Sequence, residues 1–366
     1  MQTQKEVIND KEAICLFTAF IFGSSLILGV GGSAKNDAWL AVITGIIMSV
    51  PILLVYIRLL SLYPGKDLFD ILILTFGKII GRIVAVFYIL YSFSLGGLVF
   101  RNYGEFINTV ALPETPLFVT ILSLGLLSII AVRLGIEVMG RTAALFLPII
   151  LLILAVVQLL VLPEVHFNYL KPVLAEGIGP VLMGGFKVFS FPFAETVLLI
   201  GVFSSLKTKK SPFKVFYWGI LISVITIMIL TVRNTGVLGN MADKLYFPAY
   251  EAVSRINIGD FLQRMEVTVS FVFFISVFVK SSVCLLVTSK GIAKMFNLKD
   301  YRSIVIQTGF LMIYFSYTFY DNIMEMKYWA DKVYPYYVFP VQVILPIIIW
   351  ITAEIKSRKK KQENAS

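Results

Sequence analysis

The sequence is poor in charge, histidine and cysteine. Only 15% of its 366 residues are Asp, Glu, Lys or Arg, against about one quarter in ordinary soluble domains. The single histidine, His166, has no cysteine or carboxylate pattern around it, so neither a metal site nor a serine–histidine–acid triad is expected. Because a phosphate-binding glycine loop is also missing, we expect no enzyme, no metal and no cofactor.

The two cysteines exclude a disulfide framework. Cys15 and Cys284 both fall in the cytoplasmic halves of expected membrane helices, where a disulfide is not favoured. A free cysteine in such a place behaves as a small apolar side chain. We therefore interpret both as packing residues.

Long apolar runs dominate what is present. Hydrophobic residues make up 58% of the chain, and ten runs approach the length of about 20 residues that a helix needs to cross a bilayer. The sequence therefore predicts an all-α membrane protein, with one polytopic domain over residues 1–356 and a basic cytoplasmic tail over 357–366. The expected spans cover residues 12–32, 38–62, 82–111, 115–133, 140–162, 180–204, 213–237, 265–290, 302–320 and 333–356.

The distribution of basic residues predicts the orientation. With alternating spans, most of the 32 Lys and Arg residues fall on the side that both termini share, and such residues are retained in the cytoplasm. Both termini are therefore expected to be cytoplasmic. The net charge of +10 lies mostly in inner segments such as "LKTKKSPFK" and in the tail, which favours contact with anionic lipid over nucleic acid.

Two connecting segments have features of their own. Residues 67–78, "DLFDILILTFGK", are amphipathic and predict a short helix at the inner surface. Residues 238–264 form a long outer loop rich in aromatic and charged side chains. Because long loops in compact proteins are usually functional or disordered, and aromatic content argues against disorder, we expect a lid over the outer mouth.

The first and sixth spans are interrupted near mid-membrane. "FIFGSSLILGVGG" carries Gly23, Ser24 and Ser25, and "FKVFSFPFAE" carries Pro192. These are the first helices of two five-helix halves. Backbone groups that Gly and Pro release in a bilayer need partners, and matched breaks point to a substrate site between inverted repeats. The alternative interpretation is that both are packing notches or kinks.

Two broken helices offer free N–H groups and free carbonyls, which together suit a zwitterion such as an amino acid. Its carboxylate would lie near Ser24 and Ser25, and its ammonium near the carbonyls of residues 189–191. Phenylalanines in the second break would line the pocket or face lipid. The candidate ligand-binding residues are Gly23, Ser24, Ser25, Phe189, Ser190, Phe191, Pro192 and Glu195.

Charged residues within spans are the other candidates. Glu195, three residues after the proline, is expected to accept from the ligand amine or from the first helix, or only to tie two helices together. Lys280 should face the interior with a partner, unless it reaches the inner interface. With Ser281 and Ser282 it could replace the cation of sodium-coupled carriers, which would make the protein independent of sodium and coupled to protons.

Three more basic residues lie in the outer halves of spans: Arg101, Lys187 and Arg233. Arg101 and Glu105 are four positions apart on one helix and form either a gate or, as we favour, a neutralised pair. Lys187 and Arg233 are expected to extend to the interface and are given no chemical role.

Several segments resemble a known family. These are "FIFGSSLILG", "LPETP", "YLKPVLAEGIGP", "FPFAE" and "FPAYEAVSRINIGDFLQRMEV". With the ten spans and the basic tail, they are similar to the B subunit of bacterial spore germinant receptors, the spore permease family of the amino acid–polyamine–organocation superfamily. The first break here reads "GSSLILG", where members of that family often have more glycine.

The resemblance implies a five-plus-five inverted-repeat (LeuT-like) fold with discontinuous first and sixth helices. It also implies a nutrient sensor in the inner membrane of the spore, beside A and C subunits, with a small ligand that is most often an amino acid. Sensing needs only different affinities for two states. A proton-coupled amino acid transporter is the alternative, and a passive scaffold is the third.

Overall fold

The computed structural model describes residues 6–206, 208, 210–255 and 265–363. Within these residues the regular secondary structure is helical, apart from an isolated parallel bridge between Ile8 and Leu206. The all-α prediction is confirmed. Helices of the first half are α1 (Asp10–Leu28), α2 (Ala38–Leu62), α3 (Leu68–Val110), α4 (Leu117–Leu134) and α5 (Ile136–Val161). Those of the second half are α6 (Ile178–Val188), α7 (Ser211–Leu238), α8 (Pro248–Ser254), α9 (Glu266–Met295), α10 (Val305–Thr318), α11 (Ile323–Lys332), α12 (Tyr334–Phe339) and α13 (Leu345–Glu363).

Short irregular helices join these elements. After α6 the chain continues through a π-helical turn and then a 3₁₀ segment, which together complete the sixth span. The π turns are Phe189–Phe193 and Pro340–Ile344, and the 3₁₀ segments are Gly32–Asp37, Leu162–Glu164, Phe167–Leu170, Ala194–Gly201, Phe203–Ser205, Gly239–Met241 and Tyr301–Ser303.

Nine of the ten expected spans correspond to membrane-length helices, and the span expected at 302–320 does not. Among the described residues, nine helical stretches are long and apolar enough to cross a bilayer, so the protein is a multi-pass membrane protein. The expected span at 302–320 contains α10, which has 14 residues and packs against α3, α4 and α9. Helix α13 continues to Glu363, so the segment expected as a tail from residue 357 begins inside a helix.

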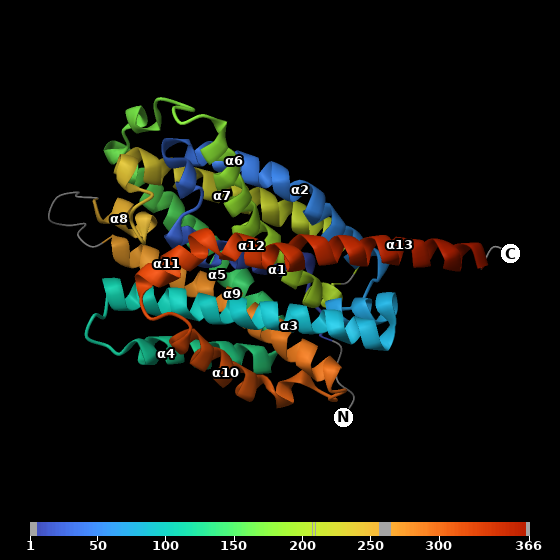
Figure 1. The fold of residues 1–366 in the computed structure, drawn as a ribbon. Coiled ribbons are helices and arrows are strands. Elements are labelled where there is room, and N and C mark those ends of the chain that lie inside the picture. Colours follow the sequence, from blue (N-terminus) through green and yellow to red (C-terminus); the bar gives the residue numbers. More distant parts are fainter. Residues whose placement is uncertain (1–5, 207, 209, 256–264, 364–366) are drawn as a thin grey trace.

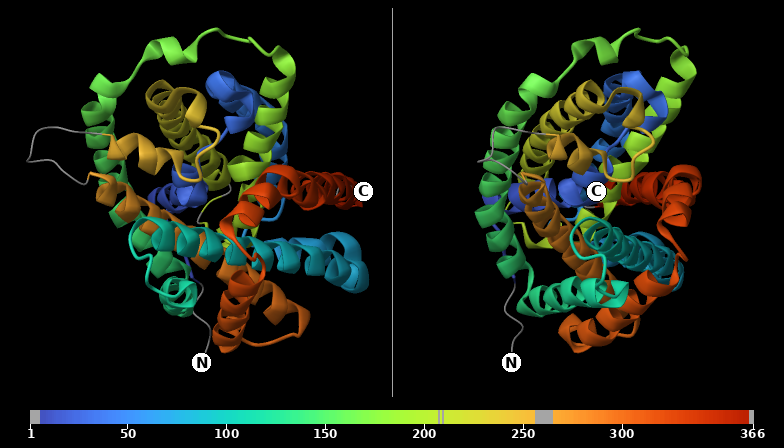
Figure 2. Two further views of the ribbon diagram at one scale, coloured as in Figure 1. Left: turned by 60° about the vertical axis from the view of Figure 1, so that its left-hand side comes forward. Right: turned by 90° about the vertical axis from the view of Figure 1, so that its left-hand side faces the viewer.

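Helices α1 and α9 form the centre of the bundle. Their membrane-length windows are 78% and 83% buried, against 28% for α5. A helix that is apolar on every side is buried, and Figure 2 shows α1, in dark blue, enclosed by other helices. At its N-terminus, Asn9 and Glu12 form a capping box through each other's backbone N–H groups. The two central helices carry the residues of the site below.

Helix α3 contains the predicted surface helix. Its first arm begins after Asp67, whose side chain caps the helix by accepting from the Asp70 N–H. At Gly77 the backbone has φ +80°, a conformation that glycine adopts without steric cost, and the helix changes direction there (Figure 1). The helix expected over 67–78 is thus present as a bent extension of the third span.

The long segment after α7 covers one end of the bundle. Figure 1 shows α8 and α11 at the left-hand ends of the long helices, opposite the protruding end of α13. Helix α8 packs against α1, α7 and α9 and buries Pro248, Ala249, Ala252 and Val253. Residues 256–264 of the predicted lid lie outside the described residues.

Candidate ligand-binding site

The helix of α1 is broken at Gly23. This residue has φ +23° and ψ −124°, which are not helical values. The Ser25 hydroxyl donates to the carbonyls of Ile21 and Phe22, at 2.9 Å each. A Cβ atom on Gly23 would lie 2.3 Å from Cδ of Lys280, so glycine is required by both backbone and space. The first predicted break is therefore present. The Ser25 hydroxyl forms hydrogen bonds with the two backbone carbonyls just before the break.

The sixth span is broken at Phe191 and Pro192. Phe191 has an extended backbone (φ −137°, ψ 116°), and Pro192 has no N–H to donate. Side chains from other helices take up the freed carbonyls. Nε2 of Gln342 donates to the Ser190 carbonyl at 3.0 Å. The Tyr56 hydroxyl donates to the Gln342 carbonyl at 2.5 Å and lies 3.3 Å from the Ala194 carbonyl. Side chains from α2 and from the turn before α13, Tyr56 and Gln342, therefore stabilise the break.

These contacts limit what the second break offers a ligand. The Phe189 carbonyl accepts from the Ala194 N–H, and the Ser190 carbonyl accepts from Gln342. The Ser190 hydroxyl donates to the Phe186 carbonyl at 3.0 Å. Two of the three carbonyls expected to face a ligand ammonium are therefore already bonded within the protein.

An ion pair lies between the two breaks. Nζ of Lys280 is 2.5 Å from Oε2 of Glu195, and both side chains are completely buried. The Tyr334 hydroxyl donates to the other oxygen of Glu195. The ammonium also lies 4.9 Å from the ring centroid of Phe191 and 5.5 Å from that of Phe20. The expectation that Lys280 faces the interior with a partner is confirmed, and that partner is Glu195.

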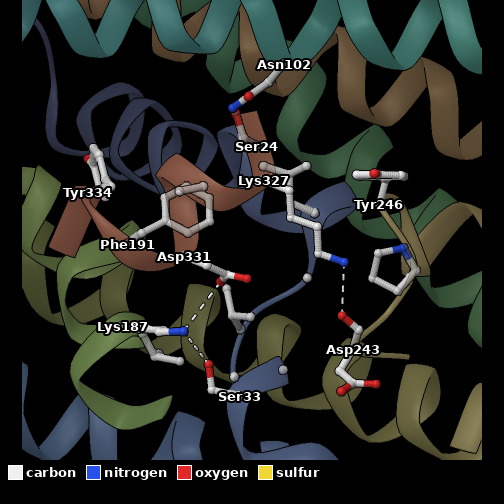
Figure 3. Close-up of a pocket in the computed structure, with 18 of the residues that line it drawn as sticks. Ser24, Ser33, Asn102, Lys187, Phe191, Asp243, Tyr246, Lys327, Asp331 and Tyr334 are labelled. Carbon is white, nitrogen blue, oxygen red and sulfur yellow. Dashed lines mark hydrogen bonds and ion pairs between the residues drawn. The ribbon is translucent and has the colours of Figure 1, made fainter. Parts of the chain in front are cut away.

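A cavity of about 450 Å³ adjoins this pair. Its walls come from α1, α3, α7, α9, α11, α12 and the broken sixth span (Figure 3). Of the predicted site residues, Ser24, Phe191, Glu195 and Lys280 line it. The others lie in the breaks or behind the wall without lining the cavity: Gly23, Ser25, Phe189, Ser190, Pro192, Ser281 and Ser282.

The serines after Lys280 have other surroundings. The Ser281 hydroxyl lies 3.0 Å from that of Ser128 on α4. The buried Ser282 hydroxyl has no hydrogen-bond partner among the described residues. Within the expected cation-site group, only Lys280 reaches the cavity.

Arg101 and Glu105 form the expected pair on α3. Nε of Arg101 lies 2.8 Å from Oε1 of Glu105, and the guanidinium also donates to the carbonyls of Ser316 and Tyr317 at the end of α10. Neither residue of the pair lines the cavity. The contacts tie α3 to α10, which fits the neutralised pair better than a gate.

Sequence reasoning missed several residues of the cavity. Asn102, which lies beside Ser24 in Figure 3, donates to the Ser24 hydroxyl at 3.1 Å. The Tyr334 hydroxyl donates to Glu195. Asn234 also lines the wall. Asn102 could have been found as an amide one position from a charged pair inside a span, whereas nothing local in the sequence distinguishes Tyr334 from other aromatic residues at span ends.

Two segments, residues 239–246 and 323–332, line one end of the cavity and are called the cover below. Nζ of Lys327 donates to the carbonyls of Asp243, Lys244 and Leu245 at 2.9–3.1 Å and lies 5.2 Å from the Tyr246 ring. Burial lowers the pKa of Lys327, while nearby carboxylates act in the opposite direction. These bonds join the two parts of the cover.

Lys187 and Arg233 differ from their expected surface role. Lys187 is partly buried, donates to the Ser33 hydroxyl at 2.5 Å and lies 3.5 Å from Asp331 (Figure 3). Arg233 is 1% exposed and donates to Asn234. The prediction that Arg233 reaches the interface was wrong, because its side chain folds along α7 into the protein.

The fold and the site define a multi-pass membrane protein with two broken helices and a cavity of about 450 Å³ beside the breaks in its first and sixth spans. The family model described as spore germination protein matches residues 7–324. The chain belongs to this family.

Curated relatives are spore germination proteins. Spore germination protein KB of Bacillus subtilis is 29% identical, with 98% of each chain covered. Spore germination protein A2 of the same organism is 26% identical, over 81% of this chain and 80% of the relative. Spore germination protein XB of Bacillus anthracis is 21% identical, over 68% and 69%.

Solved structures confirm the fold. Mhp1, a nucleobase–cation symport-1 family transporter solved with bromovinylhydantoin bound, superposes with a TM-score of 0.72 at 12% identity, covering 93% of this chain and 78% of its own. MhsT in complex with L-phenylalanine gives 0.65 at 11% identity, covering 96% and 100%. The predicted LeuT-like, five-plus-five inverted-repeat fold with discontinuous first and sixth helices is therefore confirmed.

Proposed function

We propose that the chain is the nutrient-sensing B subunit of a spore germinant receptor and binds a small nutrient between its broken helices. The observation that carries this proposal is the cavity at the paired breaks, where Ser24 of α1, Phe191 of the sixth span and the Lys280–Glu195 pair meet. Membership of the spore germination protein family supports spore germination as the process in which the nutrient acts.

The lining fits a small molecule with a polar and an apolar part. Polar groups gather at the breaks, where Asn102 is bonded to Ser24. Leu95, Val99 and Trp329 supply apolar wall. Apolar walls combined with polar groups at fixed places are typical of ligand sites, and they support an amino acid as the nutrient class. No catalytic role is assigned to any of these residues.

Lys280 takes the place of a bound cation in this proposal. Its side chain crosses the α1 break so closely that Gly23 has no room for a Cβ atom. A permanent ammonium at this point would stabilise the breaks as a cation does in sodium-coupled carriers. Ligand binding is then independent of sodium.

Sensing requires the ligand to favour one of two states. The cover is the element that moves in this proposal when a nutrient enters, because its two parts line one end of the cavity and are bonded to each other. In the proposed arrangement the protein lies in the spore inner membrane with both termini cytoplasmic. Its A and C subunits would respond to the closed state.

The test is ligand-dependent thermal stabilisation of the purified protein across the twenty amino acids, sugars and nucleosides. A ligand at 100 times its Kd stabilises the folded state by about 2.7 kcal/mol. We expect one class to raise the Tm, and Val99→Phe to abolish the shift by filling the cavity. Val119→Phe, at a residue 50% exposed on α4, is the matched control.

Absence of any stabilising compound, or an unchanged shift in Val99→Phe, would refute the proposal. Uptake into proteoliposomes separates sensing from transport. Saturable accumulation driven by a pH gradient, by this chain alone, would favour the proton-coupled amino acid transporter.

A further inference from the structure

Arg233 is a buried guanidinium whose ion-pair partner is missing among the described residues. It lies in the last part of α7 and is 1% exposed. Its Nε and Nη2 atoms both donate to Oδ1 of Asn234, at 3.1 and 2.7 Å. Burying a charge without a counter-charge destabilises the folded state. The buried position of Arg233 therefore points to a role other than stability.

This contact fixes the orientation of the Asn234 amide. The oxygen and nitrogen of an asparagine side chain are usually hard to distinguish. Here they are not, because arginine has only donors and the amide must present its oxygen to Arg233. The amide nitrogen, Nδ2, is therefore turned the other way.

Nδ2 is available to the cavity. Asn234 lines the cavity, whereas Arg233 does not. Nδ2 has no hydrogen-bond acceptor within the part of the chain that the structure describes. Gly29 lies beside Nδ2, since a Cβ atom built on it would be 4.0 Å from that nitrogen. Asn234 thus offers donors and no acceptor to whatever occupies the cavity.

The charge of Arg233 strengthens these donors. A guanidinium bonded to the amide oxygen draws electron density from the amide, and bonds in such a chain reinforce one another. The effect is largest where water is excluded, as around Arg233. The lining also holds five lysines and three carboxylates, so the cavity has an excess of positive charge.

We propose that Arg233 is a positioning residue that holds Asn234 as a donor to the carboxylate of the nutrient. The inference rests on the proposed function, because it needs a nutrient in this cavity. It places the carboxylate beside α7 and Gly29, in addition to the break in α1. The competing explanation is that Asn234 only solvates Arg233.

Asn234→Asp separates these explanations. The aspartate has the same shape and forms an ion pair with Arg233, so the Tm of the unliganded protein should be unchanged or higher. It has no N–H donors, so affinity for carboxylate-bearing compounds should fall by about tenfold, the value of one charge-assisted hydrogen bond. Unchanged affinity would show that Asn234 acts only on Arg233.

Arg233→Met and Arg233→Lys test the positioning role. The probes are the twenty L-amino acids, together with the primary amides and decarboxylated amines of those that raise the Tm. Methionine frees the Asn234 amide to turn, so the preference for acid over primary amide should shrink by about tenfold. Lysine, which also only donates, should restore part of it.

The outcomes are distinct from those of the proposed function. If no compound stabilises the wild type, the proposed function fails, and this inference fails with it. If sugars or nucleosides stabilise it but no amino acid does, nutrient binding stands and the carboxylate role of Asn234 is refuted. Unchanged affinity in Asn234→Asp, or unchanged preference for the acid in Arg233→Met, also refutes it.

Discussion

Lys280 and Glu195 form a completely buried ion pair, with 2.5 Å between Nζ and Oε2. The pair joins the central helix α9 to the unwound part of the sixth span, and Tyr334 of α12 bonds the second carboxylate oxygen. Mutual attraction balances the desolvation of two buried charges only when their remaining hydrogen-bonding groups are satisfied. The hydroxyl of Tyr334 helps to meet that condition for Glu195.

Removing one member of this pair should therefore be costly. Glu195→Gln leaves the Lys280 ammonium buried without a counter-charge, and we expect the free energy of unfolding to fall by about 3–5 kcal/mol. The double variant Glu195→Gln/Lys280→Met has no buried charge at this site and should recover much of this loss. Thermal or chemical unfolding of the wild type, Glu195→Gln, Lys280→Met and the double variant gives the double-mutant cycle.

Glu105→Gln is the control for this cycle. It breaks an ion pair in which the glutamate side chain is 13% exposed and Arg101 keeps two carbonyl acceptors, so its effect should be smaller. Strictly additive losses at Glu195 and Lys280 would show that the two charges do not depend on each other.

Gly23 should be irreplaceable for two separable reasons. In Gly23→Ala the backbone stays at φ +23° and the new Cβ atom meets Lys280 at 2.3 Å, so strain adds to overpacking. Gly77→Ala is the matched control, because Gly77 has φ +80° and nothing within 4 Å of a built Cβ atom. We expect about 1–2 kcal/mol of destabilisation in the control and clearly more in Gly23→Ala.

Ligand-dependent thermal stabilisation completes the comparison. It should persist in Gly77→Ala and disappear in Gly23→Ala, because only the second change displaces Lys280 beside the cavity. Equal losses of stability in the two variants would show that the backbone conformation alone requires glycine at residue 23.

The architecture was predictable because it depends on local sequence. Apolar runs of membrane length give the spans, since a bilayer demands internally bonded helices. The two breaks were visible as Gly23 and Pro192, which are poor helix formers in the first helix of each half. The bend at Gly77 lies near the end of the expected surface helix for the same reason.

The contacts of the site were less predictable. Lys280 and Glu195 were each recognised as unusual, but their pairing spans 85 positions and depends on how α9 lies against the sixth span. Tyr334 resembles any aromatic residue at the end of a span. Arg233 was misplaced because hydropathy gives the depth of a residue in the bilayer and not the face of the helix that carries it.

The cover should control how fast a nutrient exchanges. Lys327→Met removes three bonds from an ammonium to the carbonyls of residues 243–245, so the closed state loses a charged contact between its two parts. We expect the dissociation rate to rise by about tenfold, since one hydrogen bond to a charged group contributes roughly 1.5–3 kcal/mol. Stopped-flow dissociation measures this rate.

Lys332→Met provides the matched control. Lys332 also lines the cavity from α11, and no ion pair or hydrogen bond of its side chain is found within the described residues. The rate should stay at the wild-type value. If Lys332→Met accelerates dissociation as much as Lys327→Met, general charge in the cover matters and the specific bonds to residues 243–245 do not.

Nutrient binding should not require sodium. The Lys280 ammonium lies against the α1 break, paired with Glu195 and close to the rings of Phe20 and Phe191, so a second cation there would meet like charge in a dry environment. Titrations in sodium chloride and in choline chloride at equal ionic strength should give the same Kd, because screening of charges is then matched. A Kd about tenfold lower in sodium would mean that a metal ion still binds near the breaks, and that Lys280 has not replaced it.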